Sequence, residues 1–154
     1  MTGLRIWTTR QEVRVAAPPK RVFELVADLD RWPDIFDSVA AVERLGFNGI
    51  SERVRIVERG GHSATSVRET NTKRLQVRFR RVDLTTPFAS LGGLWVVTPK
   101  GSGAVATLVH YYGVTEDSPT TVNRVSREIA AVSSSMLDAL GRAAEFRGAV
   151  ALAS

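Results

Sequence analysis

The chain has 154 residues, of which 44% are hydrophobic and 24% charged, and a formal net charge of +5 that comes mainly from arginine. A chain of this length buries roughly two thirds of its unfolded surface, so we expect one globular domain over residues 1–154. Cysteine is absent, which excludes disulfides, thiolate nucleophiles and cysteine metal sites, and two histidines argue against a histidine-rich metal site. No apolar run reaches the roughly eighteen residues of a membrane span, so we expect a cytoplasmic protein that does not bind membranes.

The first elements predicted are a strand, over residues 11–15, and a short amphipathic helix that begins at Pro18-Pro19. The apolar face of this helix consists of Val22, Phe23, Leu25 and Val26. Alternating, β-branched runs then dominate residues 50–114 and predict about six strands. The turn signals between them are Gly60-Gly61, Asn71-Thr72 and Gly101-Ser102-Gly103, with a break from Pro87 to Gly92-Gly93 before a strand over residues 94–97.

After residue 117 the apolar period changes from two to between three and four, which predicts a long helix with one buried stripe. The stripe consists of Val125, Ile129, Val132, Met136, Leu140 and Ala143. Asp117, Ser118 and Thr120 are candidate caps at its start, and Gly148 fits its end. The order of strand, short helices, strands and long helix predicts an α+β fold with helices on one face of an antiparallel sheet.

Strand parity indicates which charged residues face inward, because alternate side chains point to opposite faces of a sheet. Leu75, Val77 and Phe79 share one apolar face, and Arg81 continues it. An unpaired buried charge costs several kcal/mol, so we expect Arg81 either at the mouth of a cavity or beside a partner such as Asp83. Parity alone leaves both faces of residues 62–69 open as the inner one.

Three segments carry a resemblance to a known family: Arg31-Trp32-Pro33-Asp34-Ile35-Phe36, Thr86-Pro87-Phe88-Ala89 and Leu94-Trp95. Their order and spacing resemble the polyketide aromatase/cyclases, members of the START and Bet v 1-like (SRPBCC) superfamily, over residues 13–112. The resemblance implies a helix-grip fold. In that fold a curved antiparallel sheet of about seven strands wraps around a long C-terminal helix and encloses a cavity, with two short helices after the first strand.

The same resemblance implies site residues. Arg68 becomes the principal catalytic candidate, and Arg81 a supporting cation. The residues implied as walls or mouth of the pocket are Trp32, Phe36, His62, Phe88, Trp95, Leu108, His110 and Tyr112. Val39 and Ala64 also belong to the implied binding site, although the better-known aromatases carry tyrosine and tryptophan there. These two departures indicate a wider or more apolar cavity, a different substrate, or no catalysis.

Ring closure of a poly-β-ketone develops negative charge on an enolate oxygen, which the guanidinium of Arg68 would stabilise. An arginine stays protonated, so proton transfer would fall to Ser66, His110 or a bound water, and no metal or organic cofactor is implied. Each assignment has a structural alternative. Arg68 could be an exposed residue that pairs with Glu58 or Glu69, and His110 could be a core histidine. The aromatic residues could be ordinary core.

The predicted ligand is a hydrophobic or aromatic polyketide-type small molecule. If their strands are neighbours, Arg53, Arg55, Arg59, Arg78 and Arg80 form a basic stripe that would fit an acidic acyl carrier protein; the alternative is solvated charge. Nucleic-acid binding is disfavoured, because the aromatic residues fall on the opposite parity to these arginines. A non-catalytic protein that carries, sequesters or gives resistance to a hydrophobic product remains the alternative function. An open cavity at Arg68 would favour catalysis.

Overall fold

The structure, a computed structural model, describes the backbone of residues 5–153 and the side chains of residues 5–146. Its elements are β1 (Trp7–Val15), α1 (Pro19–Ala27), η1 (Leu29–Arg31), α2 (Trp32–Ile35), β2 (Val39–Phe47), β3 (Glu52–Glu58), β4 (Ser63–Asn71), β5 (Gln76–Arg81), β6 (Phe88–Lys100), β7 (Gly103–Val114) and α3 (Pro119–Ala153). The seven strands form one sheet in the order β1-β7-β6-β5-β4-β3-β2, and every neighbouring pair is antiparallel.

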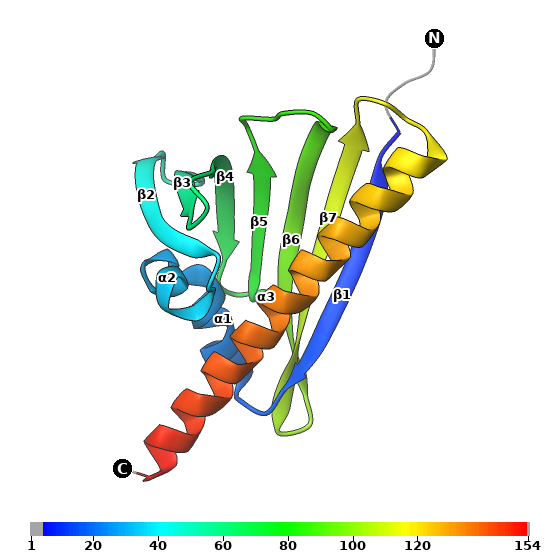
Figure 1. Ribbon diagram of the computed structural model, residues 1–154. Helices are drawn as coiled ribbons and strands as arrows, with labels where there is room; N and C mark the ends of the chain where they lie inside the picture. The colour runs from blue at the N-terminus through cyan, green and yellow to red at the C-terminus, as the bar shows by residue number, and fades with distance from the viewer. Residues whose placement is uncertain (1–4, 154) are drawn as a thin grey trace.

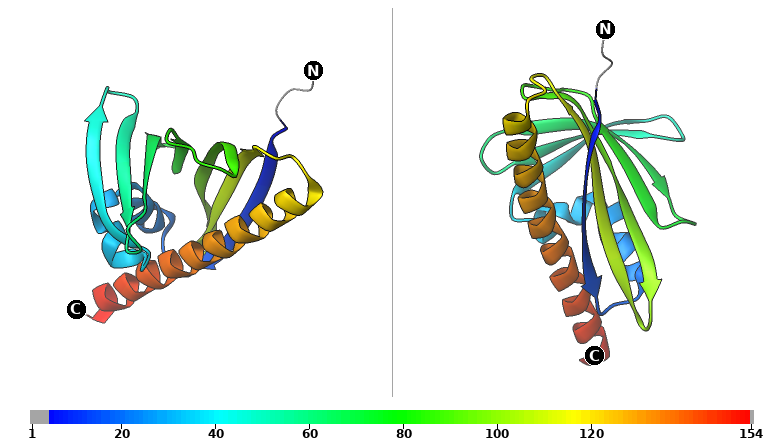
Figure 2. Two further views of the ribbon diagram at one scale, coloured as in Figure 1. Left: turned by 45° about the horizontal axis from the view of Figure 1, so that its top comes forward. Right: turned by 90° about the vertical axis from the view of Figure 1, so that its right-hand side faces the viewer.

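The sheet is bent into a deep curve, and the long helix α3 crosses its open side (Figures 1 and 2). Helix α3 packs chiefly along β1, with fewer contacts to β7 and α1. The short helices α1, η1 and α2 connect β1 to β2 and lie at one end of the curve (Figure 1). This arrangement confirms the curved sheet, the long C-terminal helix and the short helices of the predicted helix-grip fold, whereas the enclosed cavity stays a prediction. Among the described residues, no helix is long and apolar enough to cross a membrane.

Helix α1 begins where the sequence predicts, with Pro18 as its N-cap and Pro19 in its first turn. Proline suits this position because its fixed φ fits a helix and its missing N–H would have no partner there. The predicted apolar face, Val22, Phe23, Leu25 and Val26, is buried. The helix ends at Ala27, and the Asp28 side chain then accepts a hydrogen bond from the Asp30 N–H to begin η1.

The main hydrophobic core lies between the inner face of the sheet, α1, α2 and the second half of α3. Its inner-face members pair in register across three strands, because Val77, Trp95 and Leu108 are opposite one another on β5, β6 and β7. A smaller cluster surrounds Tyr112 at the first turns of α3. The core therefore leaves the charged and polar inner-face residues, among them Arg68 and His110, in the middle of the sheet between these two clusters.

Strand β6 corrects the predicted break at Gly92-Gly93, because it runs without interruption from Phe88 to Lys100. Gly93 sits where a Cβ would overlap the tip of the Phe79 ring and the carbonyl oxygen of Val109. A glycine inside a strand often marks such a close approach. Strand β5 begins at Gln76, one residue later than expected, since Leu75 adopts a positive φ of 54°.

Helix α3 corrects two details of the predicted stripe. Val132 is 59% exposed, whereas Ser133 is fully buried, so the buried face passes through Ile129, Ser133 and Leu137. The helix also continues through Gly148 to Ala153. At its start, the Ser118 hydroxyl oxygen accepts a hydrogen bond from the Thr121 N–H at 3.2 Å, as expected of a cap.

Candidate functional site

A row of residues crosses the inner face of the sheet in strict register. From β3 to β1 the row consists of Glu52, Arg68, Phe79, Gly93, His110 and Thr9. The sequence left open which face of β4 points inward. Arg68 and Ser66 are only 5% and 6% exposed, so their face is the inner one. Arg68 is therefore not an exposed residue paired with Glu58 or Glu69. The two groups with most chemical interest, Arg68 and His110, share one row with the Phe79 ring between them.

Arg68 is held by the end of α1. Its Nη2 donates a hydrogen bond of 2.8 Å to the carbonyl oxygen of Val26, and its guanidinium carbon lies 5.3 Å from the centre of the Trp32 ring. Val26 lies in the last turn of α1, where carbonyl groups lack helical partners and a cation interacts favourably with the helix dipole. Among the described residues, no carboxylate forms an ion pair with Arg68.

Burial lowers the pKa of Arg68 to about 10, against an opposing effect of the Glu52 charge. The guanidinium therefore remains charged at neutral pH. Glu52 is itself occupied, since Arg44 of β2 donates to its carboxylate at 2.6 Å. Arg68 is thus a buried cation with one carbonyl, one aromatic face and no acidic partner of its own. Strongly perturbed charged groups of this kind are candidates for functional sites.

Three aromatic rings from α2 and β6 form the wall next to Arg68. Trp32 meets Phe36 edge to face at 4.9 Å between ring centres, and it meets Trp95 at 6.2 Å. The Trp32 indole N–H donates to the same Val26 carbonyl oxygen that Arg68 uses. The three rings are at most 5% exposed. Val39 and Leu108, two further predicted binding residues, are buried in the same core cluster.

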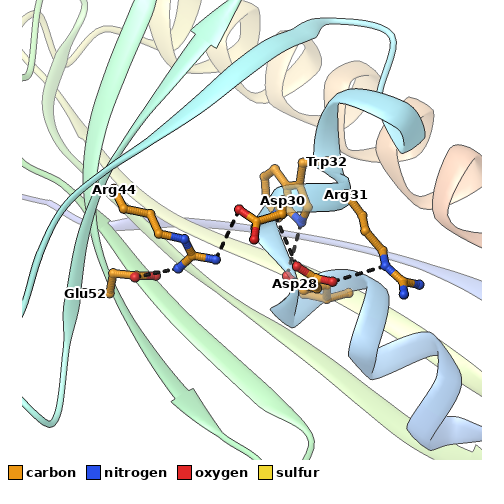
Figure 3. A network of polar contacts seen from close by, with 7 residues as sticks. Asp28, Asp30, Arg31, Trp32, Arg44 and Glu52 are labelled. Atoms are coloured by element: carbon orange, nitrogen blue, oxygen red, sulfur yellow. Dashed lines mark hydrogen bonds and ion pairs between the residues drawn. The ribbon is translucent and has the colours of Figure 1, made fainter.

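Ion pairs fix the α1–η1–α2 segment against the far end of the sheet (Figure 3). Figure 3 shows the Arg44 guanidinium between Glu52 of β3 and Asp30 of η1. The ion pair with Glu52 measures 2.6 Å and the one with Asp30 measures 3.5 Å. Arg31 pairs with Asp28 at 3.1 Å. Exposed pairs of this kind contribute little stability each. Of these pairs, Arg44–Asp30 is the one that joins the segment carrying Trp32 to the sheet.

Arg81 lies at a strand end and pairs with Asp83, whose carboxylate its Nε contacts at 3.2 Å. The Asp83 carboxylate also accepts the Thr65 N–H, so the pair is fixed. Arg81 borders a surface hollow of about 470 Å³ together with His62 and Ala64. These three predicted site residues therefore come together at one rim of the sheet rather than beside Arg68, and His62 is exposed.

His110 faces α3 from β7. Its Nδ1 lies 3.3 Å from the Ser133 hydroxyl, and its ring meets Phe79 edge to face at 5.6 Å. Burial lowers the pKa of His110 to about 4, so the imidazole is neutral at neutral pH. Phe79 and Ser133 were not predicted as site residues. The apolar parity of β5 and the poor helix propensity of serine were the signals that could have identified them.

The burial of His110 predicts a pH dependence of stability. The unfolded histidine has a pKa near 6.5, so below that pH the unfolded chain gains a proton that the folded chain does not bind until about pH 4. Stability should therefore be complete above pH 6.5 and fall by about 3 kcal/mol as the pH drops towards 4. Denaturant unfolding measured across this range should show a weaker dependence in His110→Gln. The exposed His62→Gln is the control, and equal slopes in all three proteins would contradict the prediction.

The remaining predicted residues occupy the other end of the inner face. Phe88 packs edge to face against Tyr112 at 6.3 Å, and Tyr112 is fully buried with its hydroxyl on Ser126 of α3. Both belong to the smaller core cluster. Among the described residues, no group of three or more histidine, aspartate and glutamate side chains could hold a metal ion.

The predicted basic stripe on the outer face needs correction, because β4 separates β3 from β5. Arg55 pairs with Glu43, and Arg59 lies beyond the end of β3 with its Nε on the Asp37 carbonyl oxygen. Arg78 and Arg80 instead line an outer-face hollow of about 720 Å³ with Tyr111. Of the predicted stripe, Arg78 and Arg80 remain side by side on β5. Arg53 lies in the same register row as Arg80, with Val67 of β4 between them.

A sequence model of the family described as polyketide cyclase / dehydrase and lipid transport matches residues 7–145. The chain belongs to this family. That match includes the whole inner-face row and all three aromatic residues of the wall, which agrees with the resemblance of the individual motifs.

Among curated proteins, the granaticin polyketide synthase bifunctional cyclase/dehydratase of Streptomyces violaceoruber is 34% identical over 137 residues, which is 86% of this chain and 42% of that protein. The chain therefore spans less than half the length of this relative. The crystal structure of the di-domain aromatase/cyclase BexL superposes with a TM-score of 0.81 at 28% identity, over 88% of this chain and 45% of BexL. The Zhui aromatase/cyclase from Streptomyces shares the fold, with a TM-score of 0.76 at 22% identity over 93% of this chain and 96% of that one.

Proposed function

We propose that the protein binds a poly-β-ketone intermediate against the inner face of its sheet and directs its ring closure and dehydration. The observation that supports this most directly is Arg68, a buried and charged guanidinium with no acidic partner among the described residues. A guanidinium has five N–H donors, and the Val26 carbonyl accepts one of them. The others remain for an oxygen that becomes negative during the reaction.

The chemistry needs such a group. A carbon between two carbonyls loses a proton, the resulting enolate carbon attacks a second carbonyl carbon, and the new alkoxide takes up a proton. Loss of water and enolisation of the remaining ring carbonyls then form the aromatic ring. A fixed cation in a dry site stabilises the enolate oxygen by about 3 kcal/mol, because no solvent has to reorganise. The aromatic wall of Trp32, Phe36 and Trp95 would hold the chain in one folded arrangement, which lowers the entropic part of the barrier.

The proton path in this proposal runs through neutral groups. His110 is uncharged at neutral pH because burial lowers its pKa to about 4, so it would be a weak base that relays a proton and not a resident acid. Ser66, buried two residues before Arg68 on the same face of β4, would act beside Arg68, and bound water would have to link it to His110, because β5 and β6 separate the two strands. Arg81 has a more distant role at the rim, because Asp83 already holds it.

A non-catalytic binding protein is the second candidate, and one observation favours it. Both inner-face arginines have structural partners. Arg68 bonds to the Val26 carbonyl at the end of α1, and Arg81 pairs with Asp83. Arginines committed in this way would allow the same interior to carry or sequester a hydrophobic product. The departures at Val39 and Ala64 from the better-known aromatases agree with either candidate.

The proposed partner that delivers the intermediate is an acidic acyl carrier protein. Arg78 and Arg80 line the outer-face hollow, and among the described residues neither forms an ion pair. Unpaired arginines on one face attract an acidic protein at long range and raise the rate of encounter. The charge reversal Arg80→Glu should therefore weaken the reaction of a carrier-bound substrate and leave that of a small thioester analogue unchanged.

The deciding experiment is a reconstitution of ring closure. A carrier-bound poly-β-ketone is generated in vitro, and mass spectrometry compares products with wild type, Arg68→Met, Arg127→Met and no protein. Methionine fills a similar volume without the charge, so Arg68→Met should fold at least as stably as wild type. Wild type and the exposed control Arg127→Met should redirect the products, whereas Arg68→Met should return the spontaneous mixture. If all samples match while the protein binds the products, the carrier function replaces this one.

A further inference from the structure

Three side chains on β1 carry buried polar atoms that have no hydrogen-bond partner among the described residues: the Trp7 indole N–H, the Thr9 hydroxyl and the Gln11 amide oxygen. They occupy alternate positions of the strand and therefore one face of it. Their register partners Tyr112, His110 and Leu108 fix that face as the inner one. Figure 2 shows that β1 runs beside α3. The three atoms are buried on the face of β1 that is turned toward the interior.

The polar groups of β7 that face α3 have hydrogen-bond partners. The Tyr112 hydroxyl bonds with Ser126, and the His110 ring nitrogen lies 3.3 Å from the Ser133 hydroxyl. Helix α3 thus provides partners for the polar groups of β7. For the three atoms of β1 the described part of the chain provides none.

Orphaned polar atoms of this kind need an explanation. More than nine in ten buried polar groups in native proteins are paired, because an unpaired one costs its full desolvation. The three residues that carry these atoms occupy successive inward-facing positions and span about 14 Å of strand. The described side chains supply no partner, and ordered water in the empty protein or polar groups of a ligand in the occupied one would fill that role.

We propose that Trp7, Thr9 and Gln11 form a neutral polar subsite that binds hydroxyl and carbonyl groups at one end of the ligand, while Arg68 holds the other end. The ligand class rests on the proposed function; the subsite rests on the orphaned atoms. The Trp7 indole N–H can only donate, the Gln11 amide oxygen can only accept, and the Thr9 hydroxyl can do both, so together they suit a ligand with both carbonyl and hydroxyl oxygens.

The geometry connects this subsite to the candidate site. Thr9 ends the inner-face row that begins with Glu52 and Arg68, and Phe79 and His110 lie between. A planar ligand along this row would rest on Phe79 with polar groups at both ends. Sites that hydrogen-bond a hydroxyl reject analogues without it, because the protein groups are then left unpaired. The subsite would therefore distinguish oxygenated from bare ring systems.

The test compares the binding of two probes. One is anthraflavic acid, a planar dihydroxyanthraquinone with a hydroxyl at each end, and the other is the parent anthraquinone. Quenching of tryptophan fluorescence gives Kd for wild type, Thr9→Val, Gln11→Leu and the double variant. Thr8→Val, on the exposed face of the same strand, is the matched control. We expect each inner substitution to raise the Kd for anthraflavic acid about tenfold. The Kd for anthraquinone should not change, and the thermal midpoint should stay the same or rise.

Equal binding of both probes by wild type, or unchanged binding of anthraflavic acid by the double variant, would overturn the subsite. Equal losses in Thr8→Val would overturn it too. Binding does not require ring closure, so this result is separate from the reconstitution. A wild type that redirects products but shows no hydroxyl preference disproves the subsite alone. A wild type that shows the preference but leaves the products spontaneous disproves only the proposed function.

Discussion

Replacement of Trp32 by alanine should lower the free energy of unfolding by about 4 kcal/mol, as expected for truncation of a buried aromatic residue. The side chain is 5% exposed and packs edge to face against Phe36 and Trp95. Its loss would remove this packing, leave space in the core, and take the aromatic face away from the buried Arg68 cation. It would also remove one of the two donors to the Val26 carbonyl at the end of α1.

Trp32→Phe separates these contributions in part, because it keeps a six-membered aromatic ring and loses the pyrrole ring with its N–H. The expected cost is about 2 kcal/mol, less than for alanine, since most of the packing remains and the Val26 carbonyl keeps its hydrogen bond from Arg68. Urea unfolding followed by circular dichroism measures both variants. A loss of less than about 1 kcal/mol in Trp32→Ala would show that the aromatic wall is not packed as described.

The fold was predictable from the sequence because its signals are local. Alternation on β3 and β5, two prolines at the start of α1 and the period of α3 each report on a short segment. Strands β2 and β6 were exceptions, because β2 (Val39–Phe47) lies before the residues where strands were predicted and β6 continues through the predicted break. Gly92 and Gly93 are turn signals when taken alone, and only the approach of Phe79 from the neighbouring strand explains why a strand continues through them.

The site was less predictable because it depends on register. Parity could place Arg81 on the inner face, but it could not show that Asp83 holds it at the rim, away from Arg68. Parity also does not fix which residues of neighbouring strands are paired. A shift of two residues in any strand keeps the parity but would separate Arg68 and His110 into different rows. The family resemblance, and not the spacing, identified Arg68.

Serine 133 shows how a tertiary contact can override a helical pattern. The apolar period of α3 points to Val132 as the buried position, yet Val132 is 59% exposed and Ser133 is fully buried. The reason lies across the interior, where the His110 ring nitrogen faces the Ser133 hydroxyl at 3.3 Å. A neutral histidine in a largely buried place needs a polar partner, and no property of the helix sequence by itself specifies which residue provides it.

Substitution of Gly93 by alanine should destabilise the protein by about 3 kcal/mol, the upper range for overpacking of a core. The new Cβ would overlap the Phe79 ring tip and the Val109 carbonyl oxygen, and it would lie 2.8 Å from Phe79 Cε1. The ring can rotate away, but the backbone carbonyl belongs to the β6–β7 ladder and cannot. The clash should therefore persist when Phe79 is also shortened, so that Gly93→Ala still destabilises a Phe79→Ala background.

Gly141→Ala is the matched control. Its Cβ would meet only Val15 Cγ2 at 3.7 Å, an ordinary contact, and alanine in a helix should stabilise α3 by up to about 1 kcal/mol. Opposite signs in thermal and urea unfolding would show that the cost at position 93 comes from the close approach and not from loss of glycine as such. Because Phe79 lies in register between Arg68 and His110, any displacement of its ring should also change the products of ring closure. A Gly93→Ala protein as stable as wild type would mean that β5 and β6 do not approach this closely, and that the Phe79 ring does not lie over Gly93 in the row across the sheet.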